Sequence, residues 1–123
     1  MQNENQNLQQ SHEQCPFCRI IHGESPAEII YRDDYCLAFK DIHPKAEVHI
    51  LIIPLKHIPS VNEVSEEDKE IIGHLVWAAA KIVTEIGADR NGYRLVINTG
   101  ERAGQTVFHL HIHLLSGRFL TGY

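Results

Sequence analysis

The longest regular alternation of apolar and polar side chains runs from Glu66 to Ile86 and has the period of an α-helix. Ser65 and Asp68 stand three residues apart, as in a capping box, and Gly87 suits a left-handed C-terminal cap. The sequence therefore predicts a long amphipathic helix that packs on a core. Its apolar stripe is expected to consist of Ile71, Ile72, Leu75, Val76, Ala79, Ile82, Val83 and Ile86.

Five shorter apolar segments are typical of β-strands, because β-branched or aromatic residues fill them and turn residues separate them. They cover residues 28–32, 35–40, 48–53, 93–98 and 107–115. The pair Asp33-Asp34 predicts a tight hairpin turn, and a short helix is expected to end near Gly23. This order predicts an α+β domain with an antiparallel sheet of about five strands, one long helix and one short helix.

Residues 1–14 differ from the rest of the chain, because they are rich in Gln and Asn and contain few apolar side chains. Such a segment buries too little surface to offset its ordering entropy, so we expect a disordered polar tail. Residues 15–123 are expected to form a single domain. With a net charge of −5, no run dense in Lys or Arg and no long apolar run, the sequence predicts neither an extended nucleic acid nor a membrane as a partner.

The chain contains three cysteines, an odd number, and its N-terminus does not have the pattern of a secretory signal. We therefore expect a cytoplasmic protein whose thiols are free or bind a metal. Cys15 and Cys18 form a C-x-x-C pair, which suits either a redox pair or half of a zinc site. A redox pair of the thioredoxin type needs a preceding strand, whereas a polar tail precedes this pair, so zinc is favoured. Cys36 lies in an expected strand and is interpreted as a small buried apolar residue.

Nine of the 123 residues are histidine, and three of them alternate with apolar residues in the last expected strand. Because side chains alternate between the faces of a strand, His109, His111 and His113 are expected to share one face, while Leu110 and Ile112 face the core. Imidazole suits nucleophilic attack, proton transfer and metal binding near neutral pH. At this point three interpretations stay open: a phosphate-transfer site, a purely metal-binding site, and a strand whose polar face is histidine without a function.

A polar, glycine-containing loop leads directly into these histidines. Gly100 and Gly104 allow backbone N–H groups to approach an anion, and Gln105 and Thr106 add side-chain donors. Most such loops bind nothing, but beside three imidazoles the loop is a candidate cradle for phosphate oxygens.

These segments resemble the histidine-triad (HIT) family between Cys15 and Arg118. The run His109–Leu115 is similar to the family signature, in which three histidines alternate with apolar residues. Residues 104–108 resemble its G-Q-S-V-[FY] lead-in, 37–42 its nucleoside-binding hairpin, and 49–58 its H-x-L-V-I-P-K-x-H strand. The branch that the chain most resembles is that of the Hint-type purine nucleoside phosphoramidases. The resemblance implies a HIT-like fold whose sheet continues across a homodimer.

The resemblance also implies an activity, the hydrolysis of purine nucleoside 5′-phosphoramidates of the AMP–amine type. His111 would attack phosphorus and form a nucleotidyl-histidine intermediate, which water then hydrolyses. His113 and His49 would contact phosphate oxygens or the leaving group. Thr106, which stands at the family's serine position, would donate a proton to the leaving amine. No organic cofactor is implied.

The resemblance implies two sets of binding residues, one for a purine mononucleotide and one for a structural zinc ion. Asp41 would hold the ribose hydroxyls; the alternative is that Asp41 only forms a turn. The apolar residues of the nucleotide-binding set could equally belong to the ordinary hydrophobic core. The nucleotide-binding set is Phe17, Ile20, Phe39, Asp41, Ile42, Leu51, Asn98, Gln105, Thr106, Val107, His111 and His113. The zinc ligands would be Cys15, Cys18, His57 and His109, which close a tetrahedron. The alternative is that no metal binds and that His109 forms a hydrogen bond in the active site.

Two other functions are compatible with the same residues. One is dinucleoside polyphosphate hydrolysis or nucleotidyl transfer within the same family. The other is a non-catalytic module that senses a nucleotide and binds a protein partner. The end of the chain, residues 119–123, departs from the Trp-Pro-Pro-Gly ending that is usual in the family. Leaving-group specificity is therefore the property that the resemblance determines least.

Overall fold

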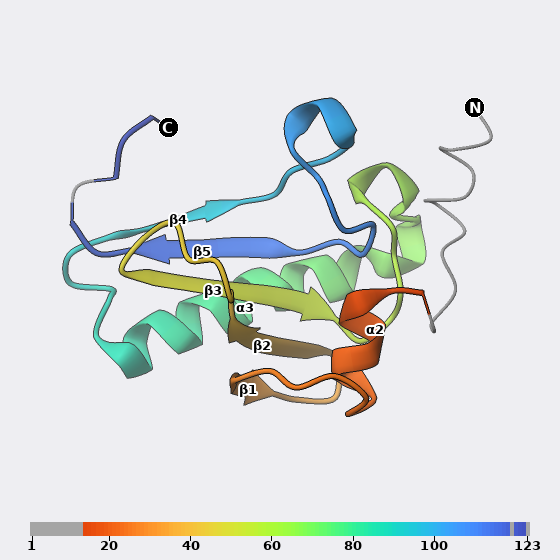
Figure 1. Cartoon of the computed structure of the whole chain (residues 1–123), viewed down its shortest axis with the longest axis horizontal. Helices are drawn as coiled ribbons and strands as arrows, with labels where there is room; N and C mark the ends of the chain where they lie inside the picture. The colour runs from red at the N-terminus through yellow and green to blue at the C-terminus, as the bar shows by residue number, and fades with distance from the viewer. Residues whose placement is uncertain (1–13, 119, 123) are drawn as a thin grey trace.

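The computed structural model describes residues 14–118 and 120–122, so nearly all of the expected polar tail lies outside the described residues. Five antiparallel strands form one sheet in the order β1-β2-β3-β5-β4 (Figure 1). This architecture confirms the expected α+β fold. The strands are β1 (Ile29–Arg32), β2 (Cys36–Lys40), β3 (Val48–Pro54), β4 (Tyr93–Val96) and β5 (Ile112–Ser116). The helices are α2 (Pro16–Ile21) and α3 (Lys69–Ile86), with short 3-10 turns at η1 (Val61–Glu63), η2 (Glu66–Asp68) and η3 (Glu101–Ala103).

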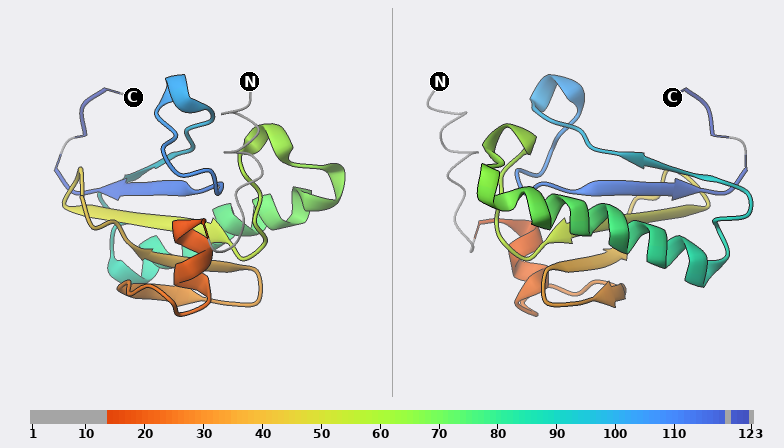
Figure 2. Two further views of the ribbon diagram at one scale, coloured as in Figure 1. Left: turned by 45° about the vertical axis from the view of Figure 1, so that its right-hand side comes forward. Right: turned by 180° about the vertical axis from the view of Figure 1, so that it is seen from behind.

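The two faces of the sheet are covered unequally. The long helix α3 crosses one face, and the short helix α2 lies on the other face at the ends of β2 and β3 (Figures 1 and 2). Because side chains alternate along each strand, the sheet supplies two separate cores. The core under α3 contains Cys36, Ala38, Ile50, Ile52, Leu110, Ile112 and Leu114. The core under α2 contains Cys15, Phe17, Cys18, Ile21, Leu37, Phe39, Leu51 and Ile53.

Helix α3 ends as the sequence predicts, whereas it begins at Lys69 and not at Glu66. Ser65 and Asp68 form the capping box, and Gly87 adopts a left-handed conformation with φ of 77°. The first predicted turn is a separate 3-10 turn, η2. The predicted stripe is too wide, because Val76 and Ile86 are 48% and 45% exposed. Val76 lies about 100° around the helix from the buried Leu75, at the margin of the buried face, and Ile86 is the last helical residue.

The last strand is shorter than the sequence predicts. Residues 107–111 lie outside the ladder, and β5 pairs with β3 and β4 only from Ile112 onward. The backbone of Leu110 instead donates a hydrogen bond to the carbonyl of Ile58, 2.7 Å away. The predicted alternation nevertheless holds, since Leu110 packs in the core under α3 and Phe17, from α2, contacts the rings of His109 and His111. Within the described residues, no helix has both the length and the hydropathy needed to cross a membrane.

Candidate active site and metal centre

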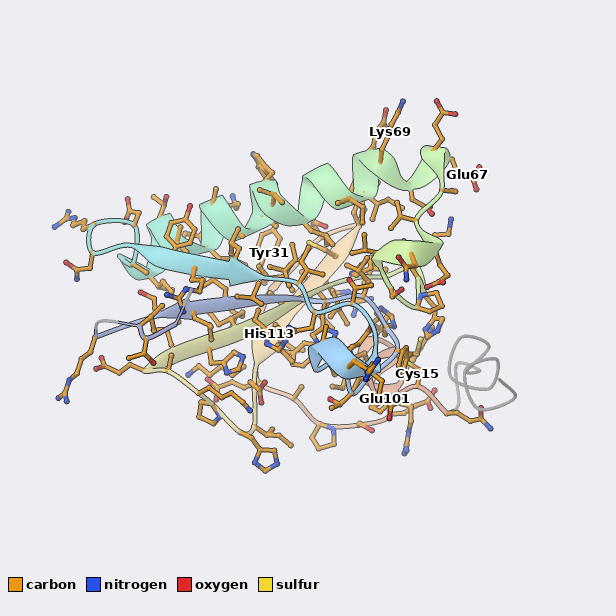
Figure 3. All side chains as sticks on the ribbon, turned by 90° about the horizontal axis from the view of Figure 1, so that it is seen from above. Cys15, Tyr31, Glu67, Lys69, Glu101 and His113 are labelled. Atoms are coloured by element: carbon orange, nitrogen blue, oxygen red, sulfur yellow. The ribbon has the colours of Figure 1, made fainter. Side chains whose placement is uncertain are left out.

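Two cavities meet on the face of the sheet that α2 partly covers, opposite to α3. Figure 3 shows His113 on this side of the sheet and Lys69, at the start of α3, on the other. The first cavity has a volume of about 420 Å³ and the second about 350 Å³. Both are lined by Asp41, His43, Thr106, His111 and His113. A phosphate held by these shared residues could place one substituent in each cavity.

The first cavity, which we call the nucleoside cavity, has mostly apolar walls. It gathers ten of the twelve residues that the sequence analysis assigned to nucleotide binding, namely Phe17, Ile20, Phe39, Asp41, Ile42, Leu51, Thr106, Val107, His111 and His113. Phe17 and Phe39 meet edge to face, with ring centroids 5.4 Å apart. A slot of this volume with aromatic and aliphatic walls suits a flat heterocyclic base.

The position of His111 leaves one ring nitrogen available for chemistry. Its Nδ1 lies 2.7 Å from the carbonyl oxygen of His109. A carbonyl can only accept, so Nδ1 carries the proton and Nε2 carries the lone pair. Burial lowers the pKa of His111, although the hydrogen bond to His109 and the charge of Asp41 oppose this shift. The ring is therefore neutral near pH 7, in the form that a nucleophile requires.

His49 and His113 form a directed chain of hydrogen bonds. The backbone N–H of Lys45 donates to Nδ1 of His49 at 3.0 Å, so a neutral His49 carries its proton on Nε2. This Nε2 lies 2.9 Å from Nδ1 of His113 and 3.4 Å from a carboxylate oxygen of Asp41. It therefore donates to His113, whose own proton is then on Nε2. Burial lowers the pKa of His113 to about 4, so this neutral arrangement persists at physiological pH.

The same contacts separate the roles expected of His49 and His113. Both nitrogens of His49 have partners within the protein, and the residue is 5% exposed. These contacts favour a positioning role for His49 toward His113, whereas the sequence suggested a contact with phosphate oxygens or the leaving group; His49 also lines the second cavity. His113 has one nitrogen occupied by His49 and lines both cavities.

The remaining predicted residues divide between the two cavities and the protein interior. Thr106 is exposed and lines both cavities, whereas Asn98 lines only the second. Gln105 differs from the prediction, because its side chain is buried and bonded within the protein. Its Oε1 accepts from the backbone of Gly100, and its Nε2 donates to the carbonyls of Pro59 and Val107. Gln105 thus braces the loop and does not offer a side-chain donor to a phosphate.

The loop after Asp41 brings two cavity residues that the sequence analysis missed. His43 lines both cavities, and Lys45 lines the second. Both are exposed loop residues, which have no periodicity to mark them. The available signal was their proximity to Asp41, two and four residues before them. Asp41 accepts a hydrogen bond from the backbone N–H of His43 through Oδ1, 2.8 Å away, so it shapes this turn as well as lining the cavities.

A second cluster joins the N-terminal helix to the histidine segment. The side chains of Cys15, Cys18, His57 and His109 converge, with their donor atoms within 4.8 Å of one another. Sulfur-to-Nδ1 distances are 3.4 Å from Cys15 to His109 and 3.3 Å from Cys18 to His57, and the two Nδ1 atoms are 3.1 Å apart. A tetrahedral zinc ion with two sulfur and two nitrogen ligands needs separations of about 3.3 to 3.8 Å. The donor set fits zinc in chemistry, and these three separations lie within about 0.2 Å of that range.

The protonation of His109 also fits a metal ligand. Its Nε2 donates to the carbonyl of Pro54 at 2.8 Å, which leaves the lone pair on Nδ1, directed at the cysteines. Burial lowers the pKa of His109 to about 4 and raises the pKa of Cys18 to about 12. A cation placed between these groups would offset the cost of forming a buried thiolate.

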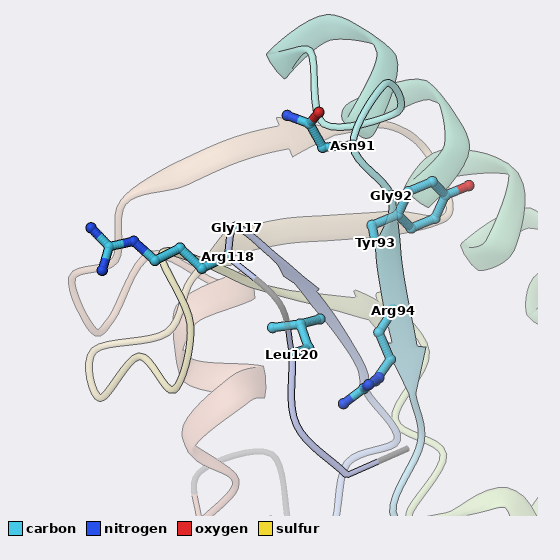
Figure 4. A pocket seen from close by; sticks show the side chains of 7 residues that line it. All are labelled: Asn91, Gly92, Tyr93, Arg94, Gly117, Arg118 and Leu120. Atoms are coloured by element: carbon cyan, nitrogen blue, oxygen red, sulfur yellow. The ribbon is translucent and has the colours of Figure 1, made fainter.

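A third cavity lies away from both clusters, between the start of β4 and the end of the chain (Figure 4). Its volume is about 600 Å³, and its described lining contains no histidine, cysteine or carboxylate. Arg94 reaches across it and donates to the backbone carbonyls of Thr121 and Gly122. Arg94 thus anchors the C-terminal segment, and the described lining of this cavity offers no histidine as a nucleophile for phosphate transfer.

The fold and the alternating histidines identify the protein as a histidine-triad protein, and comparison with known sequences shows that it belongs to the HIT family. The HIT domain model matches residues 22–120. The purine nucleoside phosphoramidase of Escherichia coli K12 is 48% identical over 106 residues, which cover 86% of this chain and 89% of that protein.

Two solved structures extend the comparison. A HIT family hydrolase from Clostridium thermocellum has 46% sequence identity and a TM-score of 0.88, over 92% of this chain and 98% of its own. A zinc-bound histidine-triad protein from Mycobacterium smegmatis has 34% identity and a TM-score of 0.74, over 88% of this chain and 78% of its own.

Proposed function

We propose that this protein hydrolyses purine nucleoside 5′-phosphoramidates through a nucleotidyl-histidine intermediate. The observation that carries the proposal is the free Nε2 lone pair of His111, fixed by the His109 carbonyl where two cavities meet. The 48% identity to a purine nucleoside phosphoramidase supports the substrate class. In this function the apolar nucleoside cavity binds the purine and the ribose.

The residues at the junction of the cavities account for each step of such a reaction. Nε2 of His111 attacks phosphorus, the phosphorus–nitrogen bond to the amine breaks, and the amine leaves with a proton from the Thr106 hydroxyl. Nε2–H of His113 donates to a phosphate oxygen on which charge develops. Water then attacks phosphorus and gives a proton to the Thr106 oxygen, and the phosphorus–nitrogen bond to His111 breaks. The nucleoside monophosphate is released, with His111 returned to its neutral state and the Thr106 hydroxyl restored.

The binding role of Asp41 follows from its place in the lining of both cavities. Oδ1 accepts from the turn, and Oδ2 lies 3.4 Å from Nε2 of His49. A carboxylate there can accept hydrogen bonds from two ribose hydroxyls. Asn98, in the second cavity, is assigned to the phosphate or the leaving group.

Trapping the intermediate tests this function directly. The protein is mixed with an AMP–amine, quenched within milliseconds, and analysed by intact mass for one added adenylyl group. Diadenosine tetraphosphate, offered in parallel, tests the dinucleoside polyphosphate alternative. Turnover of diadenosine tetraphosphate alone would reject the phosphoramidase assignment. Binding of AMP without turnover of either compound would instead favour the non-catalytic module.

We propose that the cysteine–histidine cluster holds one structural zinc ion. Four protein ligands leave no open position for a reacting water, so the metal would supply folding energy and not catalysis. Its ligands tie α2, the turn after β3 and the histidine segment to one another. Metal analysis of the purified protein should give about one zinc per chain, and replacing both Cys15 and Cys18 by serine should remove it.

A homodimer is also part of the proposal. In the described sheet β4 is an edge strand, and large apolar side chains lie exposed on it and after it, with Tyr93 at 40% and Ile97 at 38%. Pairing two β4 edges would cover these groups and continue the sheet. Light scattering should give twice the chain mass. A cytoplasmic location, a single domain over residues 15–123 and the absence of an organic cofactor stay predictions.

A further inference from the structure

A row of aromatic side chains on α3 and the neighbouring hairpin has no part in the proposed function. His74 lies between Tyr35, from the segment that joins β1 and β2, and Trp77, one turn further along α3. The ring centroids of Tyr35 and His74 are 4.9 Å apart, and those of His74 and Trp77 are 5.2 Å apart. Tyr35 and Trp77 are 55% and 53% exposed. Large rings exposed side by side are typical of a surface that binds a partner.

Asp33 holds this aromatic row in place. One oxygen of its carboxylate accepts hydrogen bonds from Nε2 of His74 at 2.5 Å and from the Tyr31 hydroxyl at 2.7 Å. The other oxygen accepts from the backbone N–H groups of Tyr35 at 2.8 Å and Cys36 at 2.9 Å. Burial disfavours the charged form, but these hydrogen bonds keep the pKa of Asp33 below its usual range. Because the hairpin and the helix are joined in this way, a ligand would meet rings that need little reordering.

A further cavity, of about 400 Å³, adjoins the row near the start of α3. It is lined by two rings, one aliphatic side chain and two carboxylates: Tyr35, His74, Ile71, Glu67 and Glu70. The cavity lies on the α3 side of the sheet, opposite to the nucleoside cavity. It is large enough for one long side chain of a partner, so its lining determines which side chain fits.

The charge of this cavity is negative. Among the described residues, no ion pair to Glu70 is present. Glu67 lies 3.8 Å from Nζ of Lys56, but the same Nζ is 2.6 Å from the buried carboxylate of Asp68, which neutralises it. The cavity therefore offers carboxylate charge that the protein itself does not balance.

The two ends of the aromatic row differ in their access to a cation. Nζ of Lys81 lies 5.8 Å from the ring centroid of Trp77 and 6.0 Å from that of Tyr31, so this end already has one. In the part of the chain that the structure describes, no such cation stands over the Tyr35 ring. An exposed ring beside free carboxylates complements a cation from outside the chain.

We propose that this cavity docks an arginine side chain of a partner protein. The guanidinium group is planar and always charged, so it stacks on the Tyr35 ring while its N–H groups donate to the Glu70 carboxylate. A lysine ammonium lacks the flat face that stacks. An apolar side chain next to the arginine covers the exposed part of Trp77. In the proposed dimer this surface stays open, because β1 and β4 are opposite edges of the sheet.

Binding can be followed by fluorescence, because Trp77 is the single tryptophan of the chain. The probes are acetylated and amidated peptides Gly-X-Leu-Gly in which X is arginine, citrulline or lysine, and citrulline has the shape of arginine without its charge. The arginine peptide should change the emission of Trp77 with a Kd in the millimolar range. It should bind about three- to tenfold more tightly than the citrulline peptide, and about 0.5 M NaCl should shrink this difference.

Substitutions in the cavity show whether its carboxylate and its ring are responsible. Glu70→Gln should weaken binding of the arginine peptide by about three- to fivefold and leave binding of the citrulline peptide unchanged. Tyr35→Ala should weaken binding of both peptides, because both stack on the ring. The matched control is Glu101→Gln, which removes an equal charge from η3, on the other side of the sheet from α3 (Figure 3), and should change neither.

The opposite outcomes overturn the proposal. One is that no peptide changes the emission of Trp77 at about 10 mM, above the Kd expected of one anchored side chain. Another is that the arginine peptide binds no better than the citrulline or the lysine peptide. If dilution of the protein alone shifted the emission in step with the mass from light scattering, the occupant would be a second copy of this chain. None of these measurements uses phosphoramidate turnover, so they do not depend on the proposed function.

Discussion

His109 and His111 are two residues apart and face the same side of the sheet, yet their rings have different partners. His109 is fully buried, with Nε2 bonded to the Pro54 carbonyl and Nδ1 among the cysteines. His111 uses Nδ1 for the carbonyl of His109, which leaves the lone pair on Nε2, and the residue lines both cavities. The partner of one nitrogen thus determines what the other can do. The two sites are linked, because the residue assigned to the metal also fixes the tautomer of the nucleophile.

Removing the nucleophile should have the largest effect. We expect His111→Ala to lower kcat/KM for an AMP–amine by about 10⁴-fold or more, because no other group replaces the covalent step. The adenylyl adduct should be absent from the intact mass spectrum. His22→Ala, on the exposed end of α2, serves as the control for loss of a histidine. Full turnover by His111→Ala would disprove the assignment.

Removing ligands of the proposed zinc site, to which His109 belongs, should affect the stability of the protein first. The double replacement of Cys15 and Cys18 by serine should lower Tm by more than 10 °C, since 1 kcal/mol corresponds to about 4 °C in a domain of this size. Cys36→Ser is the matched control, because Cys36 is equally buried but lies in the other core. It should cost stability without changing the metal content. If the wild type, the double serine variant and Cys36→Ser contained equal amounts of zinc, the proposed ligands would be ruled out.

The role of His49 can be separated from that of His113 by pH. His49→Asn should lower kcat by about 10- to 100-fold and change KM little, because His113 loses the donor that fixes its tautomer. In the wild type the pKa of His113 is about 4, below the usual 6.5, so neutral His113 and activity should persist below pH 6.5. Burial remains in the variant, but the Nε2–H of His49 no longer holds Nδ1 of His113 in its unprotonated form, so the pKa of His113 should rise. The acid limb of kcat should therefore move to higher pH. An unmoved limb would contradict a positioning role.

The smallest effect is expected at the ribose. Asp41→Asn should raise KM about tenfold, because two hydrogen bonds lose their charged acceptor. A 2′-deoxy substrate provides the check, since the wild type should prefer the ribo form and Asp41→Asn should distinguish the two poorly. If the variant still preferred the ribo substrate by the full wild-type factor, Asp41 would be a turn residue only.

Periodicity predicted the elements, their order and the shared face of the histidines. It could not predict that residues 107–111 leave the ladder, because this depends on the backbone contact between Leu110 and Ile58, distant in sequence. It also could not show that Gln105 bonds inward, since side-chain amides suit both a ligand and a loop. His43 and Lys45 lie in an aperiodic loop, so only the folded chain reveals that they line the second cavity.

The segment from His109 to Ser116 carries its imidazoles and its core residues alternately, and it ends in β5, which lies between β3 and β4. A one-residue insertion or deletion in this stretch would exchange the two faces, placing imidazoles among the aliphatic residues under α3 and leucines at the cavity. Evolution can therefore replace individual side chains here, but it cannot vary the length. Any lengthening of the gene that survives selection should be confined to the loops and the chain ends.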